Sequence, residues 1–234
     1  MDPRPLAHPP RRGRVTRAAL LVAGAALLAS AAPGHAEPGD LAPTAPLAAY
    51  HEAARLGALG GVAGQAQQDG PRPGDPPRPR AGVDVVLLPW SGALVRALED
   101  VRRRAREDEQ VYRTAGRRLA TLRQAYEQSL RAHGAADLVR TTTTGADGAF
   151  ALEDVPAGRW LLVAEFREHV RTRHAGRPTR RDKIFGAPPR LEGYRVTTVW
   201  LRELVLAPGH VERVELTERG AWMRAVDEER RDGG

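Results

Sequence analysis

The residue types that could do chemistry are present in this chain, but they are scattered. His51 precedes Glu52, and no second histidine follows at the spacing found in zinc peptidases. His169 and His174 are five residues apart, which matches no metal-ligand motif. No glycine-rich phosphate loop and no Gly-x-Ser-x-Gly sequence is present. The sequence therefore predicts no metal, no cofactor and no catalytic residue, which is the pattern of a protein that is not an enzyme.

Two groups of residues could bind a ligand through their surface chemistry. Trp90 and Trp222 lie outside the predicted strands and could stack on a sugar ring, whereas Trp200 is expected in the core. The segment 171–183 could attract an anionic polymer or lipid surface through its basic residues, which are Arg171, Arg173, Arg177, Arg180, Arg181 and Lys183. Acidic residues lie nearby and no aromatic residue interrupts the segment, so an ordinary solvated loop is the alternative. Trp90 and the arginines form the candidate ligand surface, with an envelope polysaccharide as the candidate partner.

The charge balance argues against nucleic acid as a partner. The chain carries 36 basic and 29 acidic residues, a formal net charge of +7. Residues 1–36 hold five arginines and one aspartate, which leaves 31 basic and 28 acidic residues, or +3, in the rest. A nucleic-acid-binding protein is expected to keep a strong basic excess on one face. The chain also has no cysteine, which excludes disulfide bonds.

The N-terminus predicts export. Five arginines precede the apolar run Ala18 to Ala32, and Gly34-His35-Ala36 forms a small-x-small exit. The run is shorter than the roughly 20 residues that a membrane-spanning helix needs. We therefore predict a Sec-type signal peptide over residues 1–36, cleaved after Ala36. The remaining protein would be periplasmic or secreted, with no integral membrane segment.

The rest of the chain predicts short strands. Residues 37–57 form a Pro/Ala-rich linker with a candidate short helix around Tyr50. Trp160, Leu162, Ala164 and Phe166 would share one strand face and fill the space between two sheets. Strand patterns bounded by Gly, Pro and Asp cover 61–67, 82–88, 138–144, 149–152, 159–166, 194–206 and 210–217.

A helical pattern interrupts the strands between residues 94 and 133, where apolar residues recur at steps of three and four. One straight helix over these residues would be about 60 Å long, too long to connect two strands of a small sandwich. We therefore predict a helical hairpin that breaks at Asp108 or Gly116, although the nearly continuous stripe favours one long helix. We expect the hairpin to close on itself and on one end of the sandwich, as a spacer or a site for a protein partner. Its apolar stripe includes Leu98, Val101, Leu119 and Leu122.

Residues 141–166 carry a family resemblance. An Asp147-Gly148 turn precedes Phe150, and a Val155-Pro156-Ala157-Gly158 turn precedes Trp160. This pattern resembles carboxypeptidase regulatory-like domains, whose fold is a transthyretin-like β-sandwich. The resemblance implies a mainly β protein with an antiparallel sandwich over 58–220. The helical hairpin, 92–136, would be inserted between the second and third strands, and residues 221–234 would be a polar tail.

The resemblance also implies that Asp147, Gly148, Pro156 and Gly158 are turn residues, and that 194–217 is a closing hairpin. It indicates nothing about the ligand. The function predicted here is an exported, non-enzymatic module of the bacterial cell envelope with a binding or structural role. A carbohydrate- or anionic-polymer-binding module is the alternative.

A related sandwich raises a remote enzymatic alternative. Intradiol ring-cleavage dioxygenases have similar turns and hold ferric iron with two tyrosines and two histidines. This chain has no His-x-His pair after the Pro-x-Gly strand. Its tyrosines are scattered along the sequence at Tyr50, Tyr112, Tyr126 and Tyr194.

Overall fold

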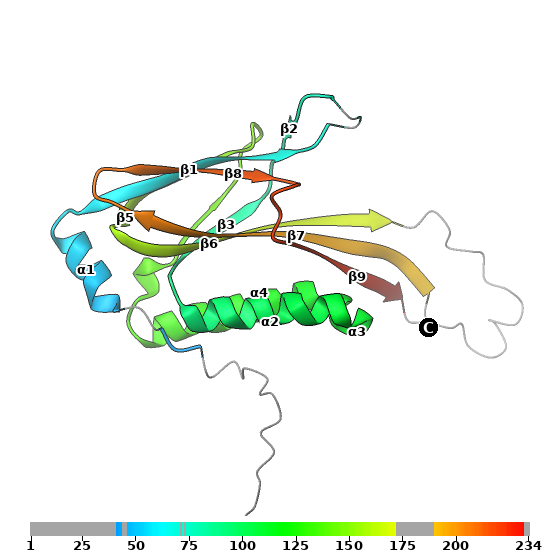
Figure 1. Cartoon of the computed structure of the whole chain (residues 1–234), viewed down its shortest axis with the longest axis horizontal. Helices are drawn as coiled ribbons and strands as arrows, with labels where there is room; N and C mark the ends of the chain where they lie inside the picture. Colours follow the sequence, from blue (N-terminus) through cyan, green and yellow to red (C-terminus); the bar gives the residue numbers. More distant parts are fainter. Residues whose placement is uncertain (1–40, 44–45, 71, 73, 172–189, 232–234) are drawn as a thin grey trace, which may run out of the picture. The chain divides into compact units, whose positions relative to one another are not determined.

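Two β-sheets and a layer of helices form the part of the chain that the computed structural model describes, which is residues 41–43, 46–70, 72, 74–171 and 190–231 (Figure 1). All of these residues belong to one compact unit that starts at His35. None of the helices in these residues combines the length and the hydropathy needed to cross a lipid bilayer. The proposed signal peptide and most of the basic segment lie outside the described residues.

The first sheet, sheet A, is built around β1 (Leu59–Gln68). β5 (Ala149–Pro156) pairs antiparallel with β1, and the short β2 (Arg78–Pro79) also pairs antiparallel, with the end of β1. β8 (Val211–Thr217) runs parallel to β1 along the other edge. The center strand therefore joins segments from both halves of the chain.

The second sheet, sheet B, has the strand order β4-β3-β6-β7-β9, with all neighbours antiparallel. Its strands are β4 (Arg140–Thr143), β3 (Asp84–Pro89), β6 (Gly158–Arg171), β7 (Arg190–Leu206) and β9 (Met223–Arg231). A strand forms at each of the seven segments that the sequence predicts. The prediction of a mainly β protein with two facing sheets is confirmed.

The predicted closing hairpin is wrong. β7 belongs to sheet B and β8 to sheet A, so the turn at 207–210 carries the chain from one sheet to the other. Gly209 has a φ of 71° in this turn, and its amide donates to the Leu59 carbonyl over 2.7 Å. Because β8 then pairs parallel to β1, the sheets are not purely antiparallel.

The expectation of a polar tail at 221–234 is also wrong, because β9 forms there and pairs with β7. Met223, Ala225 and Asp227 alternate as buried residues in β9. The many charged residues after Val226 hide this period-two pattern in the sequence.

The helical segment forms a hairpin with a break at Asp108. α2 (Gly92–Glu107) and α4 (Ala115–Ala132) are its arms, with the short α3 (Glu109–Tyr112) between them. Asp108 has an extended backbone, and its side chain accepts from the Gln110 amide over 2.7 Å, which caps α3. Gly116, the other predicted break, lies within α4. A Cβ added there would lie 3.2 Å from Thr197 and Asp227, so this glycine allows α4 to approach sheet B closely.

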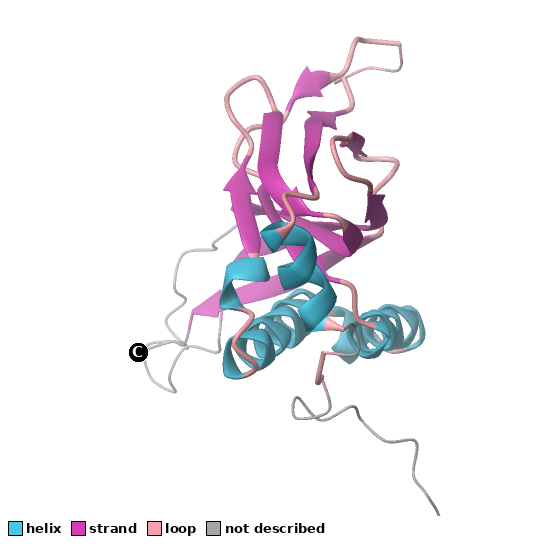
Figure 2. Cartoon of the chain, turned by 90° about the vertical axis from the view of Figure 1, so that its left-hand side faces the viewer, coloured by secondary structure: helices cyan, strands magenta, loops and turns pink. Residues whose placement is uncertain are grey.

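The hairpin was expected to lie at one end of the sandwich as an accessory, and this expectation is wrong. Leu98 of α2 and Leu119 of α4 line the same small cavity as Val163 and Val199 of sheet B. The helices thus cover the face of sheet B that points away from sheet A (Figures 1 and 2). They form a third layer, and the buried residues of all three layers make one hydrophobic core.

This third layer explains the burial of β6. Trp160, Leu162 and Ala164 have no exposed surface, as expected for the face between the sheets. Leu161 and Val163, on the opposite face, are buried as well. A strand covered on both faces has a continuous apolar sequence instead of an alternating one.

Candidate functional site

The predicted turn residues lie in turns, and their contacts are structural. The Asp147 carboxylate accepts from the Ala149 amide over 3.0 Å, and Gly148 has a φ of 77°. Pro156 ends β5, and its carbonyl accepts from Trp160 Nε1 over 2.9 Å. Gly158 has a different role. A Cβ at this position would lie 2.7 Å from Tyr50 Cε1, so the glycine allows the ring of Tyr50 to pack there.

Trp90 lies in a pocket of about 310 Å³ between α1 (Leu47–Arg55), the end of β3 and the turn between β5 and β6. α1 is the short helix predicted around Tyr50. Most of the pocket wall is apolar, which suits a ligand with an apolar face. The lining residues are Pro46, Ala49, Tyr50, Trp90, Ala157, Gly158 and Arg159.

Tyr50 fixes one wall of this pocket. Its ring packs edge-on against Trp160, with 4.9 Å between the ring centroids and 76° between the planes. Its hydroxyl donates to the Arg159 carbonyl. The buried Trp160 on one side and Gly158 on the other hold the ring in place, so this wall is preformed.

Arg159 brings charge to the same pocket. Its guanidinium lies 3.7 Å from the ring centroid of Trp90 and forms an ion pair of 2.6 Å with Glu203 of β7. The Trp90 amide donates to the Arg159 carbonyl over 3.0 Å, which holds the two residues side by side. The side chains of Arg159 and Glu203 are about half exposed, at 50% and 44%. The pocket therefore has aromatic walls and, at Arg159, a cation paired with an accessible carboxylate.

The indole nitrogen of Trp90 adds one unsatisfied group. This Nε1–H is buried and has no acceptor among the described residues. Buried donors in proteins nearly always have a partner, which can be an ordered water or a ligand oxygen.

Two tyrosines that are distant in the sequence meet beside this pocket. Tyr126 of α4 donates its hydroxyl to the Pro89 carbonyl over 3.0 Å, one residue before Trp90. Tyr50 lines the pocket together with Trp90. They would supply only half of the iron ligands of an intradiol dioxygenase. No group of three or more His, Cys, Asp or Glu side chains that could hold a metal occurs in the part of the chain that the structure describes.

We expect these tyrosines to make the protein sensitive to alkali. Burial raises the pKa of both Tyr50 and Tyr126 above the ordinary value of 10.0. The folded state therefore favours the protonated phenols, and this stabilisation is complete below pH 10 and is lost as the pH rises through the raised values. Urea unfolding at a series of pH values should show a free energy of unfolding that falls above about pH 10.

The Tyr126→Phe variant should lose less stability between pH 9 and pH 12 than the wild type, because it has one fewer phenol to ionise. Tyr112→Phe, at a partly exposed position on α3, is the control. Equal alkaline slopes for the wild type and Tyr126→Phe would contradict the assignment.

The structure does not bring Trp90 and the basic segment together. Arg171 is exposed at the last position of β6, and Arg159 is the second residue of the same strand. Twelve residues of strand separate them, which is about 40 Å. Trp90 and Arg171 therefore belong to two separate surfaces. The other predicted arginines, Arg173, Arg177, Arg180 and Arg181, lie outside the described residues.

The other two tryptophans have structural partners. Trp200 is fully buried in the core, and its Nε1 donates to the Thr217 carbonyl over 2.7 Å. Trp222 donates to the Glu99 carboxylate of α2 over 2.8 Å and so ties a helix to the sheet end. The sequence identified Trp90 but missed Tyr50 and Arg159. The only signal for Arg159 is its place between Gly158 and Trp160.

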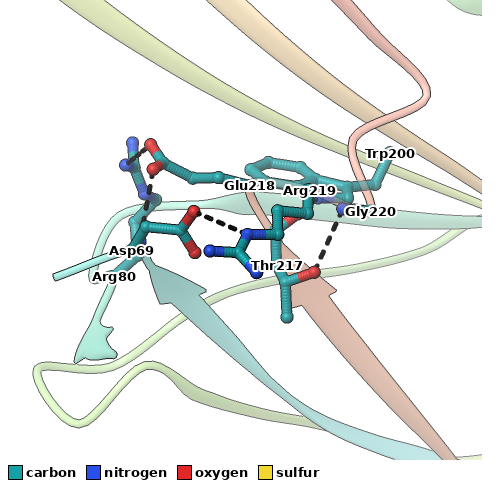
Figure 3. Close-up of polar contacts among 7 residues, drawn as sticks. All are labelled: Asp69, Arg80, Trp200, Thr217, Glu218, Arg219 and Gly220. Atoms are coloured by element: carbon teal, nitrogen blue, oxygen red, sulfur yellow. Dashed lines mark hydrogen bonds and ion pairs between the residues drawn. The ribbon is translucent and has the colours of Figure 1, made fainter. Parts of the chain in front are cut away.

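A polar network occupies the other end of sheet A (Figure 3). The Arg80 side chain, only 8% exposed, forms a 2.6 Å ion pair with Glu218 and lies 4.5 Å from the ring centroid of Phe166. Glu218 also accepts from the Asp69 amide, and the Asp69 carboxylate accepts from Arg219. These contacts hold the loop before β3 to the end of β8, while the buried Nε–H of Arg80 has no acceptor among the described residues.

Comparisons with known proteins give little further information. No protein-family model matches the chain, and no curated protein sequence matches it. A solved structure from Pseudomonas aeruginosa, whose name gives carbohydrate binding as a provisional function, aligns with 76% of this chain and 99% of its own. The sequences are 13% identical and the TM-score is 0.37. A likeness this distant does not establish a shared ligand.

Proposed function

We propose that this chain is an exported, non-enzymatic binding module and that its Trp90 pocket holds one unit of a saccharide. The observation that supports this proposal best is the composition of the pocket. Trp90 and Tyr50 provide aromatic walls, and Arg159 provides a cation at the same place, with the carboxylate of its ion-pair partner Glu203 beside it.

The chemistry of a sugar ring suits this composition. One face of the ring carries C–H groups that pack against aromatic side chains, and its edges carry hydroxyl groups that donate and accept hydrogen bonds. A guanidinium offers several donors, and a carboxylate offers acceptors. The pocket volume of about 310 Å³ is at the lower end of the range for small-molecule sites, which suits one ring of a longer polymer.

Binding of a protein partner through the helical hairpin has less support. The apolar stripe of the hairpin packs against sheet B, with Leu98 and Leu119 almost fully buried, so it is covered within the chain. The export part of the proposal depends on the sequence of residues 1–36.

The proposal predicts saturable binding to a saccharide of the bacterial envelope that depends on Trp90. A glycan array and a pull-down with cell-wall polysaccharide identify the ligand, and isothermal titration calorimetry measures its affinity. Trp90→Ala is expected to weaken binding at least about tenfold, which corresponds to about 1.4 kcal/mol. Trp90→Phe, which keeps an aromatic ring, should retain most of the affinity.

Arg159→Ala should also weaken binding, and Arg219→Ala is its matched control. Arg219 is equally a surface arginine paired with an acid, at 87% exposure, but it lies at the other end of sheet A. Binding that survives Trp90→Ala unchanged, or no binding to any glycan tested, would contradict the proposed function.

A further inference from the structure

β8 is an edge strand with an unpaired outer side. Among the described strands it pairs only with β1. The His210 carbonyl accepts from the Gly61 amide over 2.9 Å and so points toward β1. Backbone groups alternate in direction along a strand. The amides and carbonyls of the odd-numbered residues Val211, Arg213 and Glu215 therefore point outward, away from β1.

This edge has few of the features that usually prevent pairing. Soluble proteins often protect edge strands with proline, with a β-bulge or with a covering element. β8 contains no proline, and its register with β1 is continuous from Val211 to Thr217. Its solvent-exposed side chains include Arg213 and Glu215. Charged residues can also protect an edge, so whether β8 pairs with another strand depends on the charges that it would face.

β8 is also held in place at both ends. At its start, the Gly209 amide donates to the Leu59 carbonyl. At its end, Trp200 Nε1 donates to the Thr217 carbonyl, and the adjacent Glu218 pairs with the buried Arg80 (Figure 3). A fixed edge loses little conformational freedom when another strand adds to it.

We infer that the β8 strands of two copies of this chain pair antiparallel about Val214, which forms a two-fold dimer. The sequence of β8, VERVELT, is complementary to itself in this register. Arg213 of each copy lies opposite Glu215 of the other copy. Val214 lies opposite Val214 on the symmetry axis, and Val211 lies opposite Thr217.

The backbone geometry permits this register. Arg213 and Glu215 both point their amides and carbonyls outward, so they form hydrogen-bonded pairs across the interface. Val214 points its own groups toward β1 and forms the close, non-hydrogen-bonded pair at the axis. An interface in which each copy uses the same residues is closed and limits the assembly to a dimer.

The charges select this register over its neighbours. A shift that keeps the same backbone bonding moves the axis by one residue, to Arg213 or Glu215. With the axis at Arg213, two arginines lie opposite each other, and with the axis at Glu215, two glutamates do. Like charges directly opposite each other are destabilising. Arg213 and Glu215 are exposed, and neither has an ion pair among the described residues, so both are available to a second copy.

The test is the oligomeric state of the purified protein, measured by sedimentation equilibrium at micromolar concentrations. A dimer is expected. Arg213→Glu is expected to raise its dissociation constant at least about tenfold, because two pairs of carboxylates then face each other across the axis. Glu215→Arg should do the same. The double variant Arg213→Glu/Glu215→Arg should restore the dimer, because it restores both ion pairs with their signs exchanged.

Glu153→Arg, a charge reversal at an exposed position on β5, is the matched control and should leave the dimer unchanged. Thermal melts establish that each variant is folded. A wild-type protein that is monomeric at all concentrations would overturn the inference. So would a dimer that tolerates Arg213→Glu, or a double variant that stays monomeric. Saccharide binding at Trp90 is independent of these outcomes.

Discussion

Replacing residues 92–136 with a short glycine-containing turn is expected to abolish cooperative folding. The replacement removes the layer that covers sheet B and exposes Leu161, Val163 and Val199, which are almost fully buried. Each such side chain stabilises the fold by about 1.5–3 kcal/mol through burial. The loss is comparable to the whole stability of a typical domain, about 5–15 kcal/mol. Near-UV circular dichroism and a thermal melt measure the result, which should be a weak aromatic signal and no sharp transition.

The excision also tests whether the hairpin is a separable insert. A well-packed product with a cooperative melt would show that it is separable and would contradict this prediction.

A single substitution gives a graded version of the same test. Leu119→Ala should lower the free energy of unfolding by about 2–5 kcal/mol, as expected for a buried leucine. Thr121→Ala, two residues later and exposed, should change it by less than about 0.5 kcal/mol.

Removing the carboxylate of Glu218 is expected to have the largest effect of any single change at the polar end of sheet A. Glu218→Ala leaves the guanidinium of Arg80 buried and without its charge partner. Such a change typically costs about 3–5 kcal/mol. Glu218 itself is 27% exposed, so water can reach the vacated position, and we expect the lower value of about 3 kcal/mol. The melting temperature should fall by about 6–12 °C.

The double variant Arg80→Met/Glu218→Ala distinguishes this cause from simple loss of packing. It removes the buried charge together with its partner, and methionine can still contact Phe166, so it should be more stable than Glu218→Ala alone. Glu153→Ala, at an exposed glutamate of sheet A, is the control for removal of a carboxylate. A melting temperature for Glu218→Ala within 2 °C of the wild type would contradict the predicted role of this ion pair.

The sequence predicts the individual elements well and their partners poorly. Short apolar runs bounded by Gly, Pro and Asp identify the strands, and the stripe with its interruption at Asp108 identifies the hairpin and its break. A helical stripe shows that one face is buried, but it does not show against what. The missed signal lay in β3 and β6. Val85 to Leu88 and Leu161 to Ala164 are continuous apolar runs, which indicate strands that are covered on both faces.

The candidate site was predicted only in part for a similar reason. Trp90 was identified because it lies outside the strand patterns. Arg159 reaches Trp90 only after β3 pairs with β6. Tyr50 reaches it only after α1 folds against the end of the sandwich, where Tyr50 contacts Arg159, 109 residues later in the chain. Gly158 was assigned to a turn, but its close contact with Tyr50 depends on the same packing.

The parallel pairing of β1 and β8 also limits when the protein can fold. Gly61 pairs with Val211, 150 positions later, so sheet A stays incomplete until Thr217 at the end of β8 has been synthesised. Contacts of such long sequence separation form slowly, because a large loop must close before they stabilise anything. A nascent chain that has not yet made β8 therefore lacks one edge strand of sheet A and two residues of the common core, Val214 and Leu216. The order of the strands in this way delays completion of the core until late in synthesis.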